Sequence, residues 1–166
     1  QMFEEWGRRE QPLALLAKVC PECPRLTADD IARLEAARQY GQGTKYARQW
    51  LYAAFDMSLS LDPRPSMEVW RALESDTPLG HVEGTMFPAA FSHIAAHYAA
   101  GYYGYMWSQV LALDMLSKFS KDMLDAKVGH RYRDTILAQG GQVEPADMVR
   151  TFLGRKPSSE AFFKEI

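Results

Sequence analysis

The sequence predicts an all-α protein. Apolar residues recur at helical spacing along most of the chain, residues that start and end helices bound these segments, and no stretch alternates strictly enough to indicate a strand. The chain has 166 residues, of which 47% are hydrophobic and 24% are charged, as is ordinary for a globular protein with a buried core. We therefore expect residues 1–166 to form a single helical domain.

The first helical segments are predicted from their boundaries. Residues 3–19 have helical spacing, and we expect Pro12 to break them into two short pieces, because proline interrupts a helix interior. Thr27 is a good N-cap, and acidic residues follow it in the first turn, where the helix dipole favours them. This helix is expected to end near Tyr40, before the glycine-containing stretch that begins at Gly41.

The middle of the chain is predicted to hold one long and one short helix. Residues 44–61 place aromatic and aliphatic residues on a wide face that includes Trp50, so this helix is expected to be well buried. Two prolines follow it, and Ser66 can cap a short helix after them. Residues 75–88 contain two prolines and two glycines and are expected to form a loop.

The last third of the chain is predicted to contain the longest helix. Residues 101–123 are apolar nearly all round, so this helix should be central and buried. A helix over residues 129–138 is expected next. Pro145 stands at a first helical position, and the helix that it starts should extend to Gly154. A last short helix is expected after Ser158.

Charge and hydropathy bear on the kind of partner. The formal net charge is −2 and there is no basic stripe, so no nucleic-acid partner is expected. No run of 18 apolar residues occurs, so no membrane-spanning helix is expected. The first residues lack the order of a signal peptide and the context of an initiator methionine, which favours a piece of a longer protein.

Two cysteines, Cys20 and Cys23, lie in a C-P-E-C-P motif. A C-x-x-C pair can be a redox pair or half of a zinc site. No partner motif with zinc-finger spacing follows it. We therefore expect two free thiols in a proline-rich turn, and with them a reducing, cytoplasmic compartment.

The stretch from Phe91 to Gln109 is unusually rich in polar aromatic residues. It holds four tyrosines, two histidines and two glycines. One interpretation is an aromatic helix in the core, since large rings usually fill cores. The other is a loop that leads into a helix and directs phenol and imidazole groups into a cleft.

The same stretch belongs to a set of motifs that occur together in one family. Residues 84–109 read G-T-M-F-P-A-A-F-S-H-I-A-A-H-Y-A-A-G-Y-Y-G-Y-M-W-S-Q, residues 127–141 read K-V-G-H-R-Y-R-D-T-I-L-A-Q-G-G, and residues 148–162 read M-V-R-T-F-L-G-R-K-P-S-S-E-A-F. These motifs, with residues 1–6 and 46–60, resemble the C-terminal part of the thimet oligopeptidase family of zinc metallopeptidases. The resemblance implies that this chain is a C-terminal helical fragment of a zincin-like metallopeptidase catalytic domain.

The resemblance implies catalytic roles for His93, Tyr98 and Tyr105. The family's tyrosine at the position of Tyr105 donates a hydrogen bond to the oxyanion, and a phenol O–H suits this role because it donates without ionising. The alternatives are core packing for the two tyrosines and a structural histidine with satisfied hydrogen bonds for His93. The family usually has Gly-Gly where this chain has Ala96-His97, so a flexible hinge is partly lost.

Three further residues are candidates for substrate binding: His97, Tyr102 and Arg133. A guanidinium can hold a carboxylate through two hydrogen bonds, which suits Arg133 for a peptide carboxylate. The alternative for Arg133 is a salt bridge with Asp134 or Glu144. Tyr102 fits the family's tyrosine run more as a packing residue, and the alternative for His97 is simple exposure to solvent.

The sequence does not predict a metal site within this chain. His93 and His97 have the spacing of a zinc-binding helix, but position 94 is Ile94, so the glutamate of an H-E-x-x-H motif is missing. The resemblance implies that the H-E-x-x-H helix and a glutamate ligand lie upstream of Gln1. Zinc is therefore expected in the full-length parent and not in this chain.

These observations lead to one hypothesis and two alternatives. The hypothesis is the C-terminal portion of a cytoplasmic zinc metallopeptidase that hydrolyses short peptides, with this chain inactive by itself. The first alternative is a non-catalytic helical module that binds peptides or a partner, and the second is an incidental fragment with no function of its own. An exposed cleft wall would also favour self-association, because uncovered apolar area promotes contact between copies.

Overall fold

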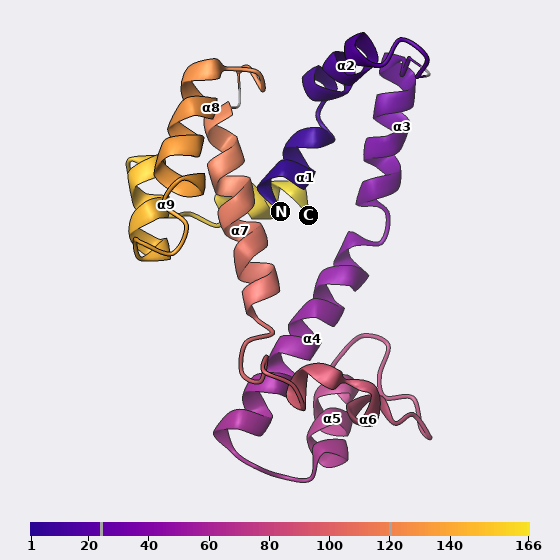
Figure 1. Ribbon diagram of the computed structural model, residues 1–166. Helices are drawn as coiled ribbons and strands as arrows, with labels where there is room; N and C mark the ends of the chain where they lie inside the picture. Colours follow the sequence, from indigo (N-terminus) through magenta and orange to yellow (C-terminus); the bar gives the residue numbers. More distant parts are fainter. Residues whose placement is uncertain (24, 120) are drawn as a thin grey trace. The chain divides into compact units, whose positions relative to one another are not determined.

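The computed structural model describes residues 1–23, 25–119 and 121–166. Helices joined by turns and loops make up these residues, and no strand occurs among them, which confirms the predicted all-α fold (Figure 1). The chain divides into two compact units. The first consists of Gln1–Tyr40 with Ser108–Ile166, and the second is Gly41–Trp107.

The first unit begins with two short helices, α1 (Met2–Gly7) and α2 (Glu10–Val19). Two pieces were predicted here, but the break lies at residues 8–9 and not at Pro12. Pro12 is the third residue of α2, in the first turn, where a backbone N–H would have no acceptor within the helix. The proline is therefore tolerated there, and it is buried.

Helix α3 (Ala28–Gln39) is capped at Thr27, as predicted. The Thr27 hydroxyl accepts a hydrogen bond from the Asp30 N–H at 3.1 Å. The Asp30 carboxylate accepts one from the Thr27 N–H at 2.9 Å. This reciprocal arrangement gives partners to two N–H groups at the helix start and fixes where the helix begins.

Cys20 and Cys23, which follow α2, form a disulfide. The prediction of two free thiols is therefore wrong. Their Cα atoms lie 5.3 Å apart, a separation that suits a disulfide, because residues 21–22 form a turn. The argument for a reducing compartment rested on free thiols and falls with them. Pro24, the second proline of the predicted turn, lies outside the described residues.

Helix α7 (Gly104–Leu116) starts in the second unit and continues into the first. It is shorter than the helix predicted over residues 101–123, because residues 101–103 belong to a loop and a 3₁₀ turn, η2 (Ser117–Phe119), follows it. Ser120 lies outside the described residues. The longest helix of the part that the structure describes is instead α4, with 20 residues.

The C-terminal helices complete the first unit. They are α8 (Ala126–Tyr132), its π-helical continuation η3 (Arg133–Leu137), α9 (Pro145–Leu153) and α10 (Glu160–Glu165). Helix α8 starts earlier than predicted, because the Asp125 side chain caps it by accepting hydrogen bonds from the N–H groups of Lys127 and Val128. The predicted start of α9 at Pro145 and its end at Gly154 are confirmed.

A buried carboxylate ties α7 to the C-terminal segment of the first unit. Asp114 is 1% exposed and accepts hydrogen bonds from the Arg155 guanidinium and, at 2.8 Å, from the Ser158 N–H. Burial by itself raises the pKa of Asp114, but the hydrogen bonds from Arg155 and Ser158 outweigh it and hold the pKa below its ordinary value. The charged form of Asp114 therefore stabilises this unit.

The second unit is built on α4 (Gln42–Leu61), beside which α5 (Ser66–Ser75) and α6 (Phe87–Ala90) lie (Figure 1). Helix α4 starts two residues earlier than predicted, after Gly41, whose φ of 73° is in the left-handed region. The 3₁₀ turn η1 (Ser92–Ile94) then leads toward the loop before α7.

Aromatic side chains form much of the core of the second unit. Phe87 stacks on Tyr52 at 4.8 Å and on Trp70 at 4.1 Å between ring centroids. Phe55, which is fully buried, contacts Trp70 edge-on at 5.3 Å. The fully buried positions and these ring contacts fix α5 and α6 against one side of α4.

Only one side of α4 is buried by this core. Leu51 and Phe55 are 5% and 0% exposed, whereas Trp50 is 50% exposed. The prediction that the wide apolar face, Trp50 included, is well buried is therefore wrong for Trp50. Helical spacing identifies the residues that share a face, but it does not tell which part of that face another element covers.

Candidate functional site

The segment from Phe91 to Tyr105 is a turn and loop that leads into a helix. Phe91 is buried in the core of the second unit, η1 follows it, and residues 95–103 form turns before α7 begins at Gly104. Of the two interpretations of this stretch, the structure agrees with the loop and contradicts the continuous aromatic helix. A loop between two fixed elements can direct several side chains toward one place.

Four of the six predicted site residues come together around His93. The centroid of its imidazole ring lies 6.0 Å from the ring of Tyr98, 5.0 Å from Tyr102 and 5.9 Å from Tyr105. Its Nε2 atom lies 3.3 Å from the Tyr105 hydroxyl oxygen, within hydrogen-bond distance. We call His93, Tyr98, Tyr102 and Tyr105 the tyrosine–histidine cluster.

The members of this cluster differ in exposure. Tyr98 is 62% exposed and Tyr105 is 47% exposed, so both side chains reach the surface of the second unit. Tyr102 is buried, and its ring packs on Phe91 at 5.2 Å and edge-on against Tyr52 at 5.6 Å. The cluster therefore combines one buried tyrosine, Tyr102, with two exposed tyrosines, Tyr98 and Tyr105.

The hydroxyl of Tyr102 has a partner on α4. It donates a hydrogen bond to the Gln49 side-chain oxygen at 3.3 Å. Burial raises the pKa of the Tyr102 phenol, more than the bond to Gln49 lowers it, so the hydroxyl stays protonated. Gln49 was not predicted as a site residue, although it belongs to the A-R-Q segment that carries the family resemblance.

The backbone of the loop is bound by Asp56, a second residue that the sequence reasoning missed. Asp56 is 0% exposed, and its two oxygens accept hydrogen bonds from the Ala100 N–H at 2.8 Å and the Tyr102 N–H at 2.9 Å. The signal in the sequence was a lone carboxylate beside Phe55 within an apolar segment. A buried carboxylate requires hydrogen-bond donors, so such a residue indicates a nearby polar anchor.

The loop has an unusual backbone where Asp56 holds it. Ala100 has a φ of +58°, a left-handed conformation that costs a residue with a Cβ roughly 1–2 kcal/mol. At Gly101, a Cβ atom would lie 3.1 Å from the carbonyl oxygen of Tyr98. Glycine is therefore the residue that fits this turn, in which the Gly101 N–H donates to the same oxygen at 3.1 Å.

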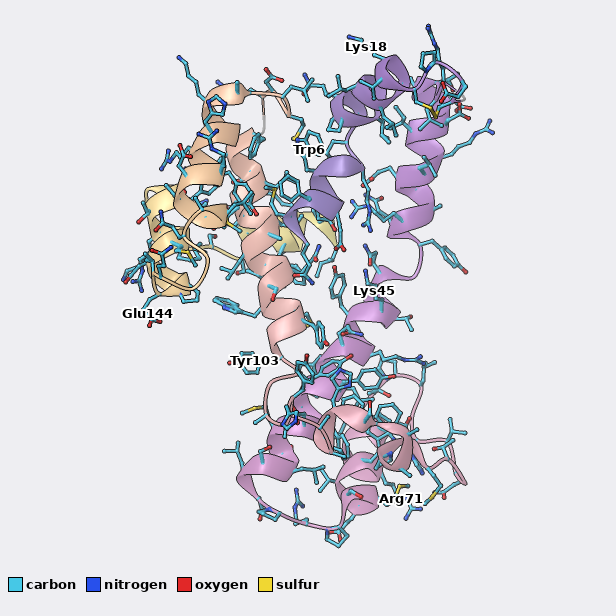
Figure 2. All side chains as sticks on the ribbon, viewed as in Figure 1. Trp6, Lys18, Lys45, Arg71, Tyr103 and Glu144 are labelled. Carbon is cyan, nitrogen blue, oxygen red and sulfur yellow. A yellow bond between two sulfur atoms is a disulfide. The ribbon has the colours of Figure 1, made fainter. Side chains whose placement is uncertain are left out.

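The other two predicted substrate-binding residues lie outside the cluster. His97 is exposed in the loop. Arg133 belongs to the first unit, where its Nε donates to the Asp134 carboxylate at 2.7 Å and both side chains are exposed. The salt bridge with Asp134 that was the alternative for Arg133 is thus present. Tyr103 is also exposed, and its ring projects away from α4 (Figure 2).

Comparison with known proteins settles the family. The model of peptidase family M3 matches residues 1–166, which is the whole chain. The chain belongs to peptidase family M3. The family that the motifs predicted is thereby confirmed.

Named proteins from other organisms are similar to this chain along nearly its full length. Saccharolysin of Saccharomyces cerevisiae is 35% identical over 174 residues, covering 100% of this chain and 24% of its own length. Oligopeptidase A of Escherichia coli is 31% identical, covering 99% of this chain and 25% of its own length. The probable cytosolic oligopeptidase A of Arabidopsis thaliana is 33% identical with the same coverage, 99% and 25%. This M3 chain thus spans about a quarter of the length of these relatives.

Two kinds of feature are absent from the described residues of this M3 chain: a group of metal ligands and a membrane-spanning helix. Among residues 1–23, 25–119 and 121–166, no three His, Cys, Asp or Glu side chains are placed to hold a metal ion together. These residues therefore do not fit the zinc that the resemblance implies. Within the same described ranges, no helix has the length and apolar character that crossing a membrane requires.

Proposed function

We propose that this chain is the C-terminal part of a longer peptidase that hydrolyses short peptides, and that the tyrosine–histidine cluster acts on the peptide bond being cleaved. The observation that carries the proposal is that the side chains of His93, Tyr98 and Tyr105 lie together and that both tyrosines are partly exposed. Membership of family M3 supports the reaction class.

The chemistry of the cluster suits a developing oxyanion. When a peptide carbonyl is attacked, negative charge grows on its oxygen, and a hydrogen-bond donor that is already in place stabilises that charge. The Tyr105 phenol can supply such a donor, because it is partly exposed and lies beside the His93 imidazole, 3.3 Å from Nε2. We assign Tyr105 as the main donor, Tyr98 as a second donor, and His93 as a donor that also orients Tyr105.

Substrate binding is assigned to three further residues. Tyr102 is buried with its hydroxyl held by Gln49, so we propose that it forms the floor on which a peptide side chain packs. His97 is exposed on the same loop and is proposed to contact the peptide backbone. Arg133 is proposed to bind a peptide carboxylate, in exchange for its exposed ion pair with Asp134.

The zinc ion of the reaction is assigned to another part of the protein. The described residues of this chain offer no ligand set for it, so we propose that the ligands belong to the three quarters of the relatives' length that this chain does not match. We further propose a cytoplasmic location, because the similar protein of Arabidopsis thaliana is named a probable cytosolic oligopeptidase A.

The experiment that tests the proposal is hydrolysis by the complete protein. Zinc-loaded complete protein is mixed with internally quenched short peptides, and turnover is measured for the wild type and for His93→Ala. We expect turnover by the wild type and a clear loss in His93→Ala at unchanged zinc content. Saturable peptide binding without hydrolysis would overturn the proposal in favour of a non-catalytic binding module.

A further inference from the structure

We propose that Asp56 is the positioning residue for the loop that carries the tyrosines. Its carboxylate holds the backbone of residues 100–102 and thereby sets where Tyr98, Tyr102 and Tyr105 stand relative to His93. The inference about catalysis rests on the proposed function, whereas the inference about the loop rests on hydrogen bonds alone.

The first step is that the buried Asp56 carboxylate receives its hydrogen bonds from the backbone of the loop. The side chain is 0% exposed, and within the described ranges no Lys, Arg or His forms an ion pair with it. A buried carboxylate without a cation needs strong hydrogen bonds from N–H groups. The backbone N–H groups of Ala100 and Tyr102 supply them, one to each oxygen, at 2.8 and 2.9 Å.

The second step is that the backbone conformation of the loop is stabilised by the Asp56 carboxylate. Ala100 has a left-handed φ of +58° although it carries a Cβ atom, and Gly101 follows it in a turn where an added Cβ atom would make a tight contact, 3.1 Å from the Tyr98 carbonyl oxygen. A strained backbone of this kind persists only where surrounding contacts hold it in place. The two hydrogen bonds to Asp56 lie on either side of Gly101, so they bracket the turn.

The third step connects this turn to the functional side chains. The Tyr98 carbonyl accepts a hydrogen bond from the Gly101 N–H at 3.1 Å, and the Tyr102 carbonyl accepts one from the Tyr105 N–H at 3.1 Å. Tyr102 is therefore held by Asp56 and in turn holds the first turn of α7, from which Tyr105 extends.

The structure supplies a matched control in Asp114. It is also a buried carboxylate on a helix, and it also accepts a hydrogen bond from the backbone of a distant segment, at Ser158. It belongs to the first unit, whereas the tyrosine–histidine cluster belongs to the second. Asn in place of either aspartate keeps the shape but turns one acceptor into a donor that faces an N–H group.

The test of the positioning role is amide hydrogen exchange, measured by NMR on the complete protein. In the wild type, the amides of Ala100 and Tyr102 should exchange more slowly than that of Ala99, whose N–H has no acceptor in the described part of the chain. Asp56→Asn should accelerate both amides at least about tenfold, and Asp114→Asn should leave them unchanged. Equal exchange of all three amides in the wild type would overturn the proposal without any variant.

The test of the catalytic consequence uses the complete protein. Because small displacements of a positioned group reduce rates strongly, we expect Asp56→Asn to lower kcat by roughly 10–100-fold, with a smaller change in KM. Asp114→Asn should lower the melting temperature without changing kcat per folded molecule. Equal kcat in the two variants would overturn the positioning role. If the complete protein hydrolyses no peptide, the proposed function fails, and the exchange experiment still decides whether Asp56 holds the loop.

Discussion

Replacing Tyr105 by Phe removes one hydroxyl oxygen and keeps the ring. The ring retains its contacts with Tyr102, at 5.0 Å between centroids, and with His93, at 5.9 Å. The hydroxyl lies 3.3 Å from His93 Nε2 in an exposed setting. Because a neutral hydrogen bond contributes only about 0.5–1.5 kcal/mol even when well formed, we expect the free energy of unfolding to change by less than about 1 kcal/mol.

The effect on catalysis should be much larger than the effect on stability. One donor to an oxyanion contributes roughly 2.7–4 kcal/mol, so kcat should fall about 10²–10³-fold in Tyr105→Phe. KM should stay close to the wild-type value, because the hydrogen bond forms mainly in the transition state. The difference between these two magnitudes separates a catalytic phenol from a packing residue.

The assay measures kcat, KM and melting temperature on one preparation of complete protein. Tyr103→Phe is the control, since Tyr103 is 53% exposed on the same stretch and projects away from α4 (Figure 2). It should match the wild type in all three quantities. Unchanged kcat in a Tyr105→Phe protein of unchanged stability would remove Tyr105 from the mechanism, and a loss of stability with normal turnover would make it a core residue.

Three further predictions concern the loop, the metal and the response to pH. Gly101→Ala places a Cβ atom 3.1 Å from the Tyr98 carbonyl oxygen and should lower the unfolding free energy by about 1–3 kcal/mol in urea denaturation; unchanged stability would show that the turn has room. The 166-residue chain should bind no stoichiometric zinc in elemental analysis, and one zinc per chain that His93→Ala removes would contradict this. The lowered pKa of Asp114 contributes stability that is present above its ordinary value of 3.8 and is lost as pH falls through the folded-state pKa. The unfolding free energy should therefore fall more steeply below about pH 4 in the wild type than in Asp114→Asn, and equal slopes would contradict the assignment.

Helix boundaries that depend on local chemistry were predictable from the sequence. Thr27 caps α3 and Pro145 begins α9, because an N-cap oxygen and a missing N–H act within one turn. Helix boundaries that depend on distant contacts were not predictable from the sequence. Residues 101–103 continue the helical pattern of α7, but Asp56 holds this backbone in another conformation from 46 residues away.

In the candidate site, too, residues within motifs were identified from the sequence, and residues defined by distant contacts were not. His93, Tyr98 and Tyr105 were identified through family motifs, and the structure brings them together around His93, while their catalytic roles stay a prediction. Asp56 and Gln49 were missed, because their partners lie 44 to 53 residues along the chain and no local pattern marks such pairs. The disulfide escaped prediction since the motif around Cys20 does not state the oxidation state of its thiols.

The exposure of Trp50 shows that helical spacing in the sequence does not predict burial. Its position on the apolar face of α4 follows from spacing, but the core of the second unit covers only the part of that face around Leu51 and Phe55. Burial depends on which elements pack against a face, and this is a property of the tertiary structure that helical periodicity does not contain.

The most direct test of the central claim is the affinity of a transition-state analogue. A phosphinic peptide presents a charged oxygen in the geometry of the tetrahedral oxyanion, whereas an uncleaved substrate peptide does not. If Tyr105 stabilises the oxyanion, Tyr105→Phe should weaken binding of the phosphinic peptide by the same factor by which it lowers kcat/KM, roughly 10²–10³-fold, and leave substrate affinity unchanged. Equal affinity of the wild type and Tyr105→Phe for the phosphinic peptide would contradict the account.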